Sequence, residues 1–337
     1  MKIQSTLNNL LGIDFPIIMA PMFLVSNEAM VKSAITHGIA GSFPSLNYRK
    51  EGELEAILRS LNNWKINNTG TYGVNLIVQK SNPLYEKHLK ICVEAKVPFY
   101  ITSLGNPKQV IEAAHGYGAK VFCDVTNITH AIKADELNCD GFIAVGQGAG
   151  GHAGSFPLSI LVSSLKKHFP NKPIIAAGGI ANGEGILSML TIGAAGVSIG
   201  TRFIASTEAG VNLEYKNSIV SSKMEDIVLS EKLSGTPCTI INTPYAKRIG
   251  YTLNWFEKLL STNNTTKKYF KMLVQIKGMK ILEQSVKPGN YNNLWCAGQS
   301  VELIDSILPI AEIINNLKTE TRASFERLSQ LIMVDPQ

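Results

Sequence analysis

The chain has 337 residues, of which 45% are hydrophobic and 17% charged, so it can bury a large core as one large domain or as one domain with an insertion. Its formal net charge of +6 is spread along the sequence without a long basic run, which gives no support to nucleic-acid binding and suits a small anionic ligand. No apolar run reaches membrane-spanning length, and the first residues lack the apolar region of a signal peptide. We therefore expect a soluble cytoplasmic protein that binds neither nucleic acid nor a membrane.

The cysteines indicate reduced thiols rather than a metal site. They are Cys92, Cys123, Cys139, Cys238 and Cys296. Their number is odd and no two of them form a C-x-x-C pair, which is typical of free thiols in a cytoplasm and unlike a structural zinc site. We expect no bound metal.

Short apolar runs alternate with amphipathic stretches from the N-terminus to about residue 204. The expected strands are residues 16–20, 39–43, 72–77, 98–102, 119–123, 141–145, 173–177 and 196–199. The expected helices between them are residues 27–36, 51–61, 83–95, 107–115, 127–137, 157–168 and 182–191. Apolar strands separated by helices predict a parallel sheet covered by helices. Eight such units close naturally into a (β/α)8, or TIM, barrel, whereas an open doubly wound sheet usually has fewer strands and a change of direction.

The regular alternation ends after Phe203. Residues 206–290 are rich in Lys, Asn, Thr and Ser, and they predict a smaller, helical inserted subdomain. Its candidate helices lie at 212–222, 255–260 and 267–286. The amphipathic stretch 301–317 predicts the closing helix of the barrel. We expect the barrel to consist of residues 1–205 and 291–337, with the insertion as a lid over the C-terminal ends of the strands, where TIM barrels carry their sites.

The loop after the expected strand 141–145 is the strongest functional signal in the chain. Residues 146–154 contain five glycines and a single histidine, His152. Such a density of glycine costs chain entropy and gives no packing in return, so we expect exposed N–H groups and room for a bulky or anionic ligand. His152 is the only titratable side chain of the loop and the first candidate for chemistry. The alternative is a flexible surface turn whose histidine is incidental.

Two later segments repeat the pattern of a strand followed by glycine. The first ends in Gly178 and Gly179, and the second runs into Gly200 and Thr201. When neighbouring parallel strands end in glycine loops that lead to helix starts, the N–H groups of these loops can converge on one phosphate. The alternative is a pair of tight strand-to-helix turns without a ligand.

Six segments, spread over essentially the whole chain, carry a family resemblance. They are residues 16–22, 73–75, 149–154, 177–180, 200–203 and 297–299. As a set they resemble the nitronate monooxygenases, also called 2-nitropropane dioxygenases, which are FMN-dependent barrels. The same superfamily contains FMN-dependent enoyl-acyl-carrier-protein reductases and NADH:quinone reductases, which share nearly all of these motifs.

The resemblance implies that FMN is the cofactor and that these segments hold it. The residues implied at the phosphate are Gly150, Gly151, Gly178, Gly179, Gly200 and Thr201. Those implied beside the isoalloxazine ring are Ala20, Pro21, Met22 and Asn75, with Gly298 and Gln299 reaching the cofactor from the C-terminal return. Many relatives carry Gly-Gly in place of Ala20-Pro21, and some carry Lys near the position of Asp124. These departures leave the subgroup open.

The resemblance further implies that His152 faces the substrate. A neutral imidazole there can take the α-proton of a nitroalkane, and an imidazolium can hold the nitronate anion. We therefore expect FMN-dependent oxidation of alkyl nitronates by dioxygen to a carbonyl compound and nitrite. The alternatives are an NAD(P)H-dependent reductase acting on an enoyl thioester or a quinone, and a protein that binds a flavin or another phosphate ligand and is not an enzyme. The expected partners are a nitronate or nitroalkane and dioxygen, and homo-oligomerisation is left open.

Other polar and large residues have weaker assignments. Asn75 ends an apolar strand, and its buried amide favours cofactor binding over an internal hydrogen bond. Met22 and Trp295 fit either the core or the site, and Arg202 fits either an ion pair within the barrel or a ligand contact. A structural role is favoured for His130. The histidines expected at the surface are His37, His88, His115 and His168.

Overall fold

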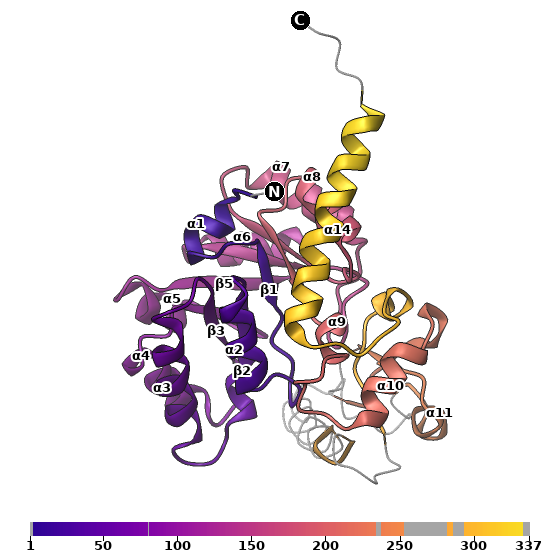
Figure 1. The fold of residues 1–337 in the computed structure, drawn as a ribbon. Helices are drawn as coiled ribbons and strands as arrows, with labels where there is room; N and C mark the ends of the chain where they lie inside the picture. The colour runs from indigo at the N-terminus through magenta and orange to yellow at the C-terminus, as the bar shows by residue number, and fades with distance from the viewer. Residues whose placement is uncertain (1–2, 80, 234–236, 253–281, 286–292, 333–337) are drawn as a thin grey trace, which may run out of the picture.

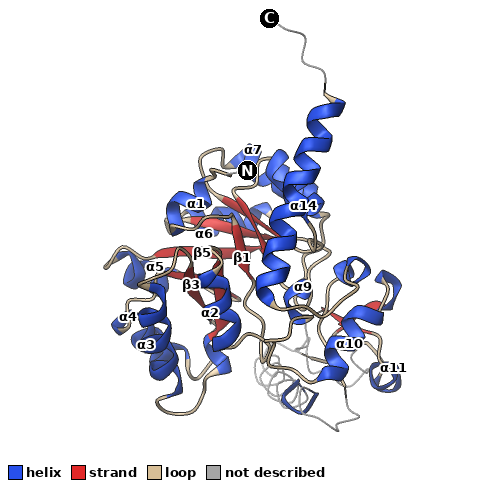
Figure 2. Cartoon of the chain, viewed as in Figure 1, coloured by secondary structure: helices blue, strands red, loops and turns tan. Residues whose placement is uncertain are grey.

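The computed structural model describes the whole chain except residues 1–2, 80, 234–236, 253–281, 286–292 and 333–337. Its centre is a closed barrel of eight parallel strands in sequential order, surrounded by helices (Figure 2). The strands are β1 (Ile17–Met19), β2 (Ala40–Pro44), β3 (Thr71–Ile77), β4 (Phe99–Ser103), β5 (Lys120–Val125), β6 (Gly141–Val145), β7 (Ile174–Ala177) and β8 (Gly196–Ile199). The predicted TIM barrel is confirmed, and each strand begins and ends within two residues of its expected limits.

The helices of the barrel follow the expected stretches closely. They are α2 (Glu28–Thr36), α3 (Glu53–Lys65), α4 (Tyr85–Glu94), α5 (Lys108–His115), α6 (Ile128–Asp135), α7 (Leu158–His168) and α8 (Gly183–Thr191). Three of them begin at an asparagine whose side chain accepts a hydrogen bond from a first-turn N–H group, namely Asn27, Asn127 and Asn182. This capping satisfies a backbone donor that the helix itself leaves unpaired, so the polar residue after each of these strands fixes where the helix starts.

The N-terminal end of the barrel is closed by α1 (Thr6–Leu11), a helix that the sequence analysis did not predict. Leu7 and Leu11 join the apolar cluster inside the barrel, and Gly196 of β8 leaves the space that Leu7 occupies. Because the barrel interior is filled and closed at this end, it is accessible from its C-terminal end, where this fold usually carries its site.

The segment after β8 contains both helices and strands. It consists of α9 (Thr201–Ile204), α10 (Leu213–Ser221), the antiparallel hairpin of β9 (Ile227–Ser230) and β10 (Cys238–Ile241), and α11 (Pro244–Ile249). The expected helix 212–222 corresponds to α10, whereas the hairpin was not predicted. Both strands have four residues rich in β-branched side chains, too few for a period to be recognised. The expected helix 255–260 and most of 267–286 lie outside the described residues.

The closing helix begins later than predicted and is longer. Residues 301–317 were expected to be one helix, but the chain forms a 3-10 turn at Gln299–Leu303 and then α14 (Ile310–Leu331). Pro309 explains the difference, because proline lacks an N–H group and drives the residue before it into an extended conformation. The helix packs against α8 and α2, and its last turns extend beyond the body of the barrel (Figure 1). None of the described helices combines the length and apolar character that crossing a membrane requires.

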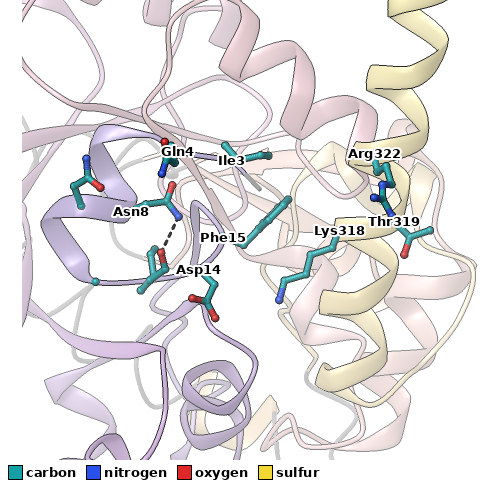
Figure 3. Close-up of a pocket in the computed structure, with 11 residues that line it drawn as sticks. Ile3, Gln4, Asn8, Asp14, Phe15, Lys318, Thr319 and Arg322 are labelled. Carbon is teal, nitrogen blue, oxygen red and sulfur yellow. Dashed lines mark hydrogen bonds between the residues drawn. The ribbon is translucent and has the colours of Figure 1, made fainter. Parts of the chain in front are cut away.

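A surface cavity of about 690 Å³ lies between the segment before β1 and α14 (Figure 3). Lys318 and Phe15 face each other across it, and the Lys318 ammonium also donates to the carbonyl of His37 over 2.8 Å. This cavity is larger than the one described below, but it lies at the N-terminal end of β1. Because TIM barrels use that end for stability rather than for catalysis, we do not assign the site to it.

Candidate functional site

A cavity of about 370 Å³ opens at the C-terminal ends of the barrel strands. The sequence-predicted residues that line it are Ala20, Pro21, Met22, Asn75, Gly150, Gly151, His152, Gly178, Gly179, Gly200 and Thr201. They come from segments up to 181 positions apart, and the barrel brings them to one place because the ends of parallel strands meet at the same rim. The structure therefore gathers all but two of the predicted site residues around a single cavity.

The remaining two, Gly298 and Gln299, do not line the cavity. The Gly298 N–H donates to the Thr201 hydroxyl over 3.0 Å, and a side chain at this position would collide with the carbonyl of Gly148. Gly298 therefore contacts residues that line the cavity without lining it itself. Gln299 is exposed, and its neighbour Ser300 lines the cavity instead.

The glycine turns after β7 and β8 leave open space toward the cavity. A Cβ atom at Gly179 would lie 3.9 Å from its nearest neighbour, and one at Gly200 would lie 3.7 Å from its nearest neighbour. Gly179 has a φ of +75°, which favours glycine, but Gly200 has a φ of −109°, which any residue adopts. The backbone of Gly200 therefore does not require glycine, and the missing side chain instead leaves a cradle of the kind an FMN phosphate needs.

The segment after β1 offers the cavity an apolar wall rather than backbone donors. The Ala20 N–H donates to the carbonyl of Ile199 over 2.8 Å, and the Met22 N–H donates to the Ser26 hydroxyl over 3.0 Å. Pro21 has no N–H group. With its donors occupied or absent, this segment can contact a flavin ring through van der Waals packing but not through backbone hydrogen bonds.

The hairpin of the insertion holds the loop that carries His152. Gly151 and Thr239 of β10 exchange two backbone hydrogen bonds, of 3.2 and 2.8 Å, and the Thr239 hydroxyl donates to the carbonyl of Ala149 over 2.6 Å. Gly151 has a φ of +73°, so glycine is required for the chain to turn there toward His152. The hairpin thus fixes an otherwise adaptable glycine loop.

Loss of the Thr239 hydroxyl is expected to loosen this loop. Thr239→Val keeps the shape of the side chain and both backbone bonds but leaves the carbonyl of Ala149 without its donor, at an expected cost of about 1 kcal/mol. We expect a roughly tenfold fall in kcat with unchanged FMN content, because a displaced His152 acts less efficiently. Amide hydrogen exchange at Gly151 should rise in parallel. Thr239→Ser retains the hydroxyl and serves as the control, and equal kinetics for the two variants would contradict the prediction.

His152 lines the cavity and is an exposed residue. The surrounding protein lowers the pKa of the imidazole, because burial disfavours the charged form. His152 is therefore mainly neutral at physiological pH. A neutral imidazole is a proton acceptor, so its surroundings favour the role of a base over that of an imidazolium that holds an anion.

The rest of the lining is largely apolar and, among the described residues, contains no lysine or arginine. Apolar side chains from the segment after β1, from β3 and β6, and from the region after β8 form most of the wall, including Met22, Phe23, Leu24, Ile77, Val145, Leu233 and Leu294. An alkyl group can be buried here, whereas a bound anion must find its hydrogen-bond donors elsewhere.

A polar chain crosses three neighbouring strands at the rim of the cavity. The Asn75 amide of β3 donates to the Ser103 hydroxyl of β4 over 2.8 Å, and Ser103 donates to the Asp124 carboxylate of β5 over 2.5 Å. Asn75 also donates to the carbonyl of Ile101 over 3.1 Å, so its amide makes internal hydrogen bonds at the strand end while the residue lines the cavity. The cofactor contact that the sequence favoured for Asn75 stays a prediction. Burial raises the pKa of Asp124 to about 6, although the hydrogen bond from Ser103 acts to lower it.

The raised pKa of Asp124 predicts a pH-dependent penalty on folding. The carboxyl titrates near 3.8 when unperturbed and near 6 in the folded chain, so its contribution to the free energy of unfolding is fully present below pH 3.8 and is lost as the pH rises through 6. Asp124→Asn removes the ionisation. We expect the variant to be more stable than the wild type at pH 8 by up to about 3 kcal/mol and the difference to shrink near pH 4. Urea unfolding of the cofactor-free proteins at both pH values measures this, and a variant less stable at pH 8 would refute it.

The structure places the three residues whose roles the sequence left open, and it corrects the expected position of His88. Both terminal nitrogens of Arg202 donate to the carbonyl of Ser306 over 3.0 Å, so among the described residues Arg202 has a carbonyl rather than a carboxylate as its partner, and it does not line the cavity. Trp295 belongs to the core, where it stacks on Tyr215 at 5.2 Å. Met22 lines the cavity. His88 is buried rather than exposed, because it lies on the face of α4 that packs against the barrel.

No role for Ser103 was predicted from the sequence, and the role of Asp124 was left open. The sequence signal for Asp124 was its carboxylate within the apolar run 121–125, because an ionisable residue near the end of a buried strand indicates a candidate functional site. Ser103 carries no such signal. Within the described ranges, no three His, Cys, Asp or Glu side chains group as ligands for a metal ion.

The closed barrel and the cavity at its C-terminal end define a TIM-barrel enzyme. A family model described as nitronate monooxygenase matches residues 45–320, and the chain therefore belongs to the nitronate monooxygenase family. Members of this family are FMN-dependent oxidoreductases. The family predicted from the sequence motifs is confirmed.

Known relatives divide among several activities. The chain is 28% identical to a probable nitronate monooxygenase of Staphylococcus saprophyticus, over 74% of this chain and 81% of the relative. It is 25% identical to a hydroxy-methyl-oxo-octahydroindene-carboxyl-CoA dehydrogenase of Rhodococcus jostii, over 84% of this chain and 78% of the relative. Among solved structures it resembles FabK of Thermotoga maritima, with a TM-score of 0.84, 29% identity and coverage of 98% of this chain and 100% of that one. The similarities establish an oxidoreductase and leave its substrate to be proposed.

Proposed function

We propose that the chain binds FMN in the cavity and oxidises alkyl nitronates with dioxygen to a carbonyl compound and nitrite. The observation that best supports this proposal is the position of a mainly neutral His152 on the same cavity as the glycine turns after β7 and β8. The apolar wall suits a small alkyl substituent. The substrates would be a nitronate or nitroalkane and dioxygen.

The FMN phosphate would lie in the cradle of open glycine turns. Gly178, Gly179, Gly200 and Thr201 form one side of this cradle, and Gly150 and Gly151 approach it from the loop that carries His152. The Thr201 hydroxyl accepts from Gly298 and still has its own proton to donate. The flavin ring would extend along Ala20, Pro21, Met22 and Asn75. FMN supplies the electron transfer when it is bound.

The remaining sequence-based assignments stay predictions. A direct contact from Gln299 to the cofactor would require its exposed side chain to turn inward. The division into a barrel of residues 1–205 and 291–337 and a lid of residues 206–290 also stays a prediction, as does a homo-oligomeric state.

His152 would act as a base on neutral nitroalkanes. Its lone pair can take the proton from the carbon that bears the nitro group, which converts the nitroalkane into its nitronate. A substrate supplied as the nitronate has already lost this proton. The lowered pKa keeps the base unprotonated at physiological pH, and protonation at lower pH should suppress turnover of the neutral form.

A second candidate is an NAD(P)H-dependent reductase of an enoyl thioester or a quinone. It is favoured by the absence of lysine and arginine from the described lining, since a neutral carbonyl substrate needs no cation at its reacting end. The similarity to FabK and to a CoA dehydrogenase agrees with this candidate.

One comparison separates the two functions. The purified flavoprotein is mixed aerobically with ethyl nitronate, and nitrite and acetaldehyde are measured; in parallel, the loss of flavin absorbance is followed anaerobically with NADH and with NADPH. We expect nitronate turnover and slow reduction by both nucleotides. Rapid flavin reduction by a nucleotide, together with no nitrite formation, would reject nitronate oxidation and establish the reductase.

A further inference from the structure

The cavity poses an electrostatic problem for an anionic substrate. The titratable residues that line it within the described ranges are Asp124, His152, Tyr215, Cys238 and Cys296. None of these is a permanent cation. Burial lowers the pKa of His152 and raises those of Tyr215 and Cys296, so these three groups are mainly neutral. An anion that enters an apolar cavity without a hydrogen-bond donor loses its solvation without compensation.

The polar chain of Asn75, Ser103 and Asp124 has a fixed direction. The carbonyl of Ile101 can only accept, so the Asn75 nitrogen must point toward it and toward Ser103. The Ser103 hydroxyl accepts from Asn75 and therefore gives its own proton to Oδ2 of Asp124. No described residue donates to the other carboxyl oxygen, Oδ1. When Asp124 is neutral, its proton is therefore best placed on Oδ1.

The barrel places the middle of this chain, Ser103 on β4, opposite the glycine turn after β8. The strands follow one another around a closed barrel, so β4 lies four strands away from β8 in either direction. Asn75, Ser103 and Asp124 lie within the last three residues of β3, β4 and β5, whereas Gly179 and Gly200 follow β7 and β8. The strand of Asp124, β5, lies two strands from β7 and three from β8. The glycine turns and Asp124 line the same cavity, so a ligand anchored by its phosphate at these turns can reach Asp124 by extending across it.

We propose that Asp124, in its neutral acid form, donates a hydrogen bond through Oδ1 to the anionic oxygen of the bound substrate, so that anion binding is coupled to the uptake of one proton. The identity of this anion as a nitronate rests on the function proposed above. The proton comes from solvent and returns to it when the anion leaves, and no covalent bond to carbon changes in this step. Asp124 thereby takes the place of a cation that the described cavity lining lacks.

The groups around Asp124 agree with this role. Ser103 and Asn75 face it from β4 and β3, Ile143 is its register partner on β6, and His152 follows on the next loop. The carboxyl has a pKa raised to about 6 by burial and has no charged partner in the described part of the chain, so the proton is bound loosely enough to exchange near physiological pH. An anionic ligand favours the protonated form and raises this pKa further.

Proton-coupled binding makes a quantitative prediction. Above the pKa of Asp124, the dissociation constant of an anion should increase about tenfold for each pH unit, because one proton is taken up per anion bound. Asp124→Asn should abolish this dependence. The Ser103 hydroxyl donates to the oxygen of the new amide as it did to Oδ2, and the NH2 group then occupies the place of Oδ1 as a donor that cannot ionise.

The test uses nitrate, a planar anion with the shape and charge of the nitro end of a nitronate. Nitrate is titrated into the FMN-loaded protein from pH 5 to pH 8, and binding is followed by the change in flavin absorbance. We expect tenfold weaker binding per pH unit above pH 6 in the wild type. Asp124→Asn should bind with similar affinity at all pH values and roughly 100-fold more tightly than the wild type at pH 8, a gain that misfolding cannot produce.

Two further variants separate Asp124 from its neighbours. His152→Gln should keep the pH dependence, since the imidazole is not its source. Ser103→Ala should move the transition to higher pH, because the hydrogen bond from Ser103 lowers the pKa of Asp124. Equal pH dependence in the wild type and in Asp124→Asn, or no nitrate binding at pH 5, would overturn the proposal. Nitrate binding does not require turnover. If the protein fails to oxidise nitronates but binds nitrate as expected, the proposed function is rejected while the proton-coupled binding of anions by Asp124 stands.

Discussion

Replacement of Gly179 or Gly200 by aspartate is expected to abolish FMN retention while the chain still folds. Each substitution places a carboxylate in the open space that the phosphate would occupy, where no neighbouring atom lies closer than 3.7 Å. Like charges in contact cost several kcal/mol, and about 3 kcal/mol already corresponds to a loss of roughly 100-fold in affinity. The purified variants should be colourless, and the flavin released on denaturation should be FMN for the wild type and absent for both variants.

The controls separate loss of the cofactor from strain in the backbone. Gly118 has a φ of +85° and lies remote from the site with open space around it, so Gly118→Asp introduces the same kind of strain as Gly179→Asp without touching the cradle. Gly200→Ala adds a methyl group at an ordinary φ and should weaken FMN binding less than Gly200→Asp. Retention of one FMN per chain in Gly200→Asp, or loss of FMN in Gly118→Asp, would contradict the assignment of the phosphate to these turns.

The barrel was predictable because its signals are local. Each strand is a short apolar run, and several strands are followed by a residue whose side chain caps the next helix, such as Asn127 after β5 and Asn182 after β7. Where such a residue is present, it marks the start of the helix directly in the sequence. The start of the closing helix was predicted wrongly because the prediction followed the amphipathic periodicity of residues 301–317 and not Pro309. A proline marks the first residues of a helix more precisely than hydrophobic periodicity does.

The site was only partly predictable. Glycine turns and a histidine in a glycine loop can be recognised along the sequence, and the barrel brings them together as expected. The polar chain of Asn75, Ser103 and Asp124 depends on the register between three strands, which no local pattern specifies. The clamp between Thr239 and Gly151 depends in turn on a hairpin that is too short to show a period. Contacts between elements distant in the sequence account for both omissions.

Replacement of His152 is expected to distinguish a base from a group that only holds the anion. If His152 is the base, His152→Ala should lower kcat/KM for a neutral nitroalkane by roughly 10²–10⁴-fold, the usual range for a positioned proton acceptor. The same variant should lose less activity with preformed nitronate, because its proton has already left. Initial rates of nitrite formation with nitroethane and with ethyl nitronate, at equal FMN content, measure the two losses.

The pH profile gives the same test an independent readout. Turnover of the neutral nitroalkane by the wild type should fall as the pH drops through the lowered pKa of His152, since only the unprotonated imidazole accepts a proton. Turnover of preformed nitronate should not show this decrease at low pH. His168→Ala, at the exposed end of α7, is the control and should leave both substrates unaffected. Equal losses with both substrates, mainly in binding, would instead assign His152 to the anion. Unchanged nitronate kinetics in His152→Ala, together with rapid NADH-driven reduction of an enoyl thioester or quinone, would reject the oxidase chemistry and establish the reductase.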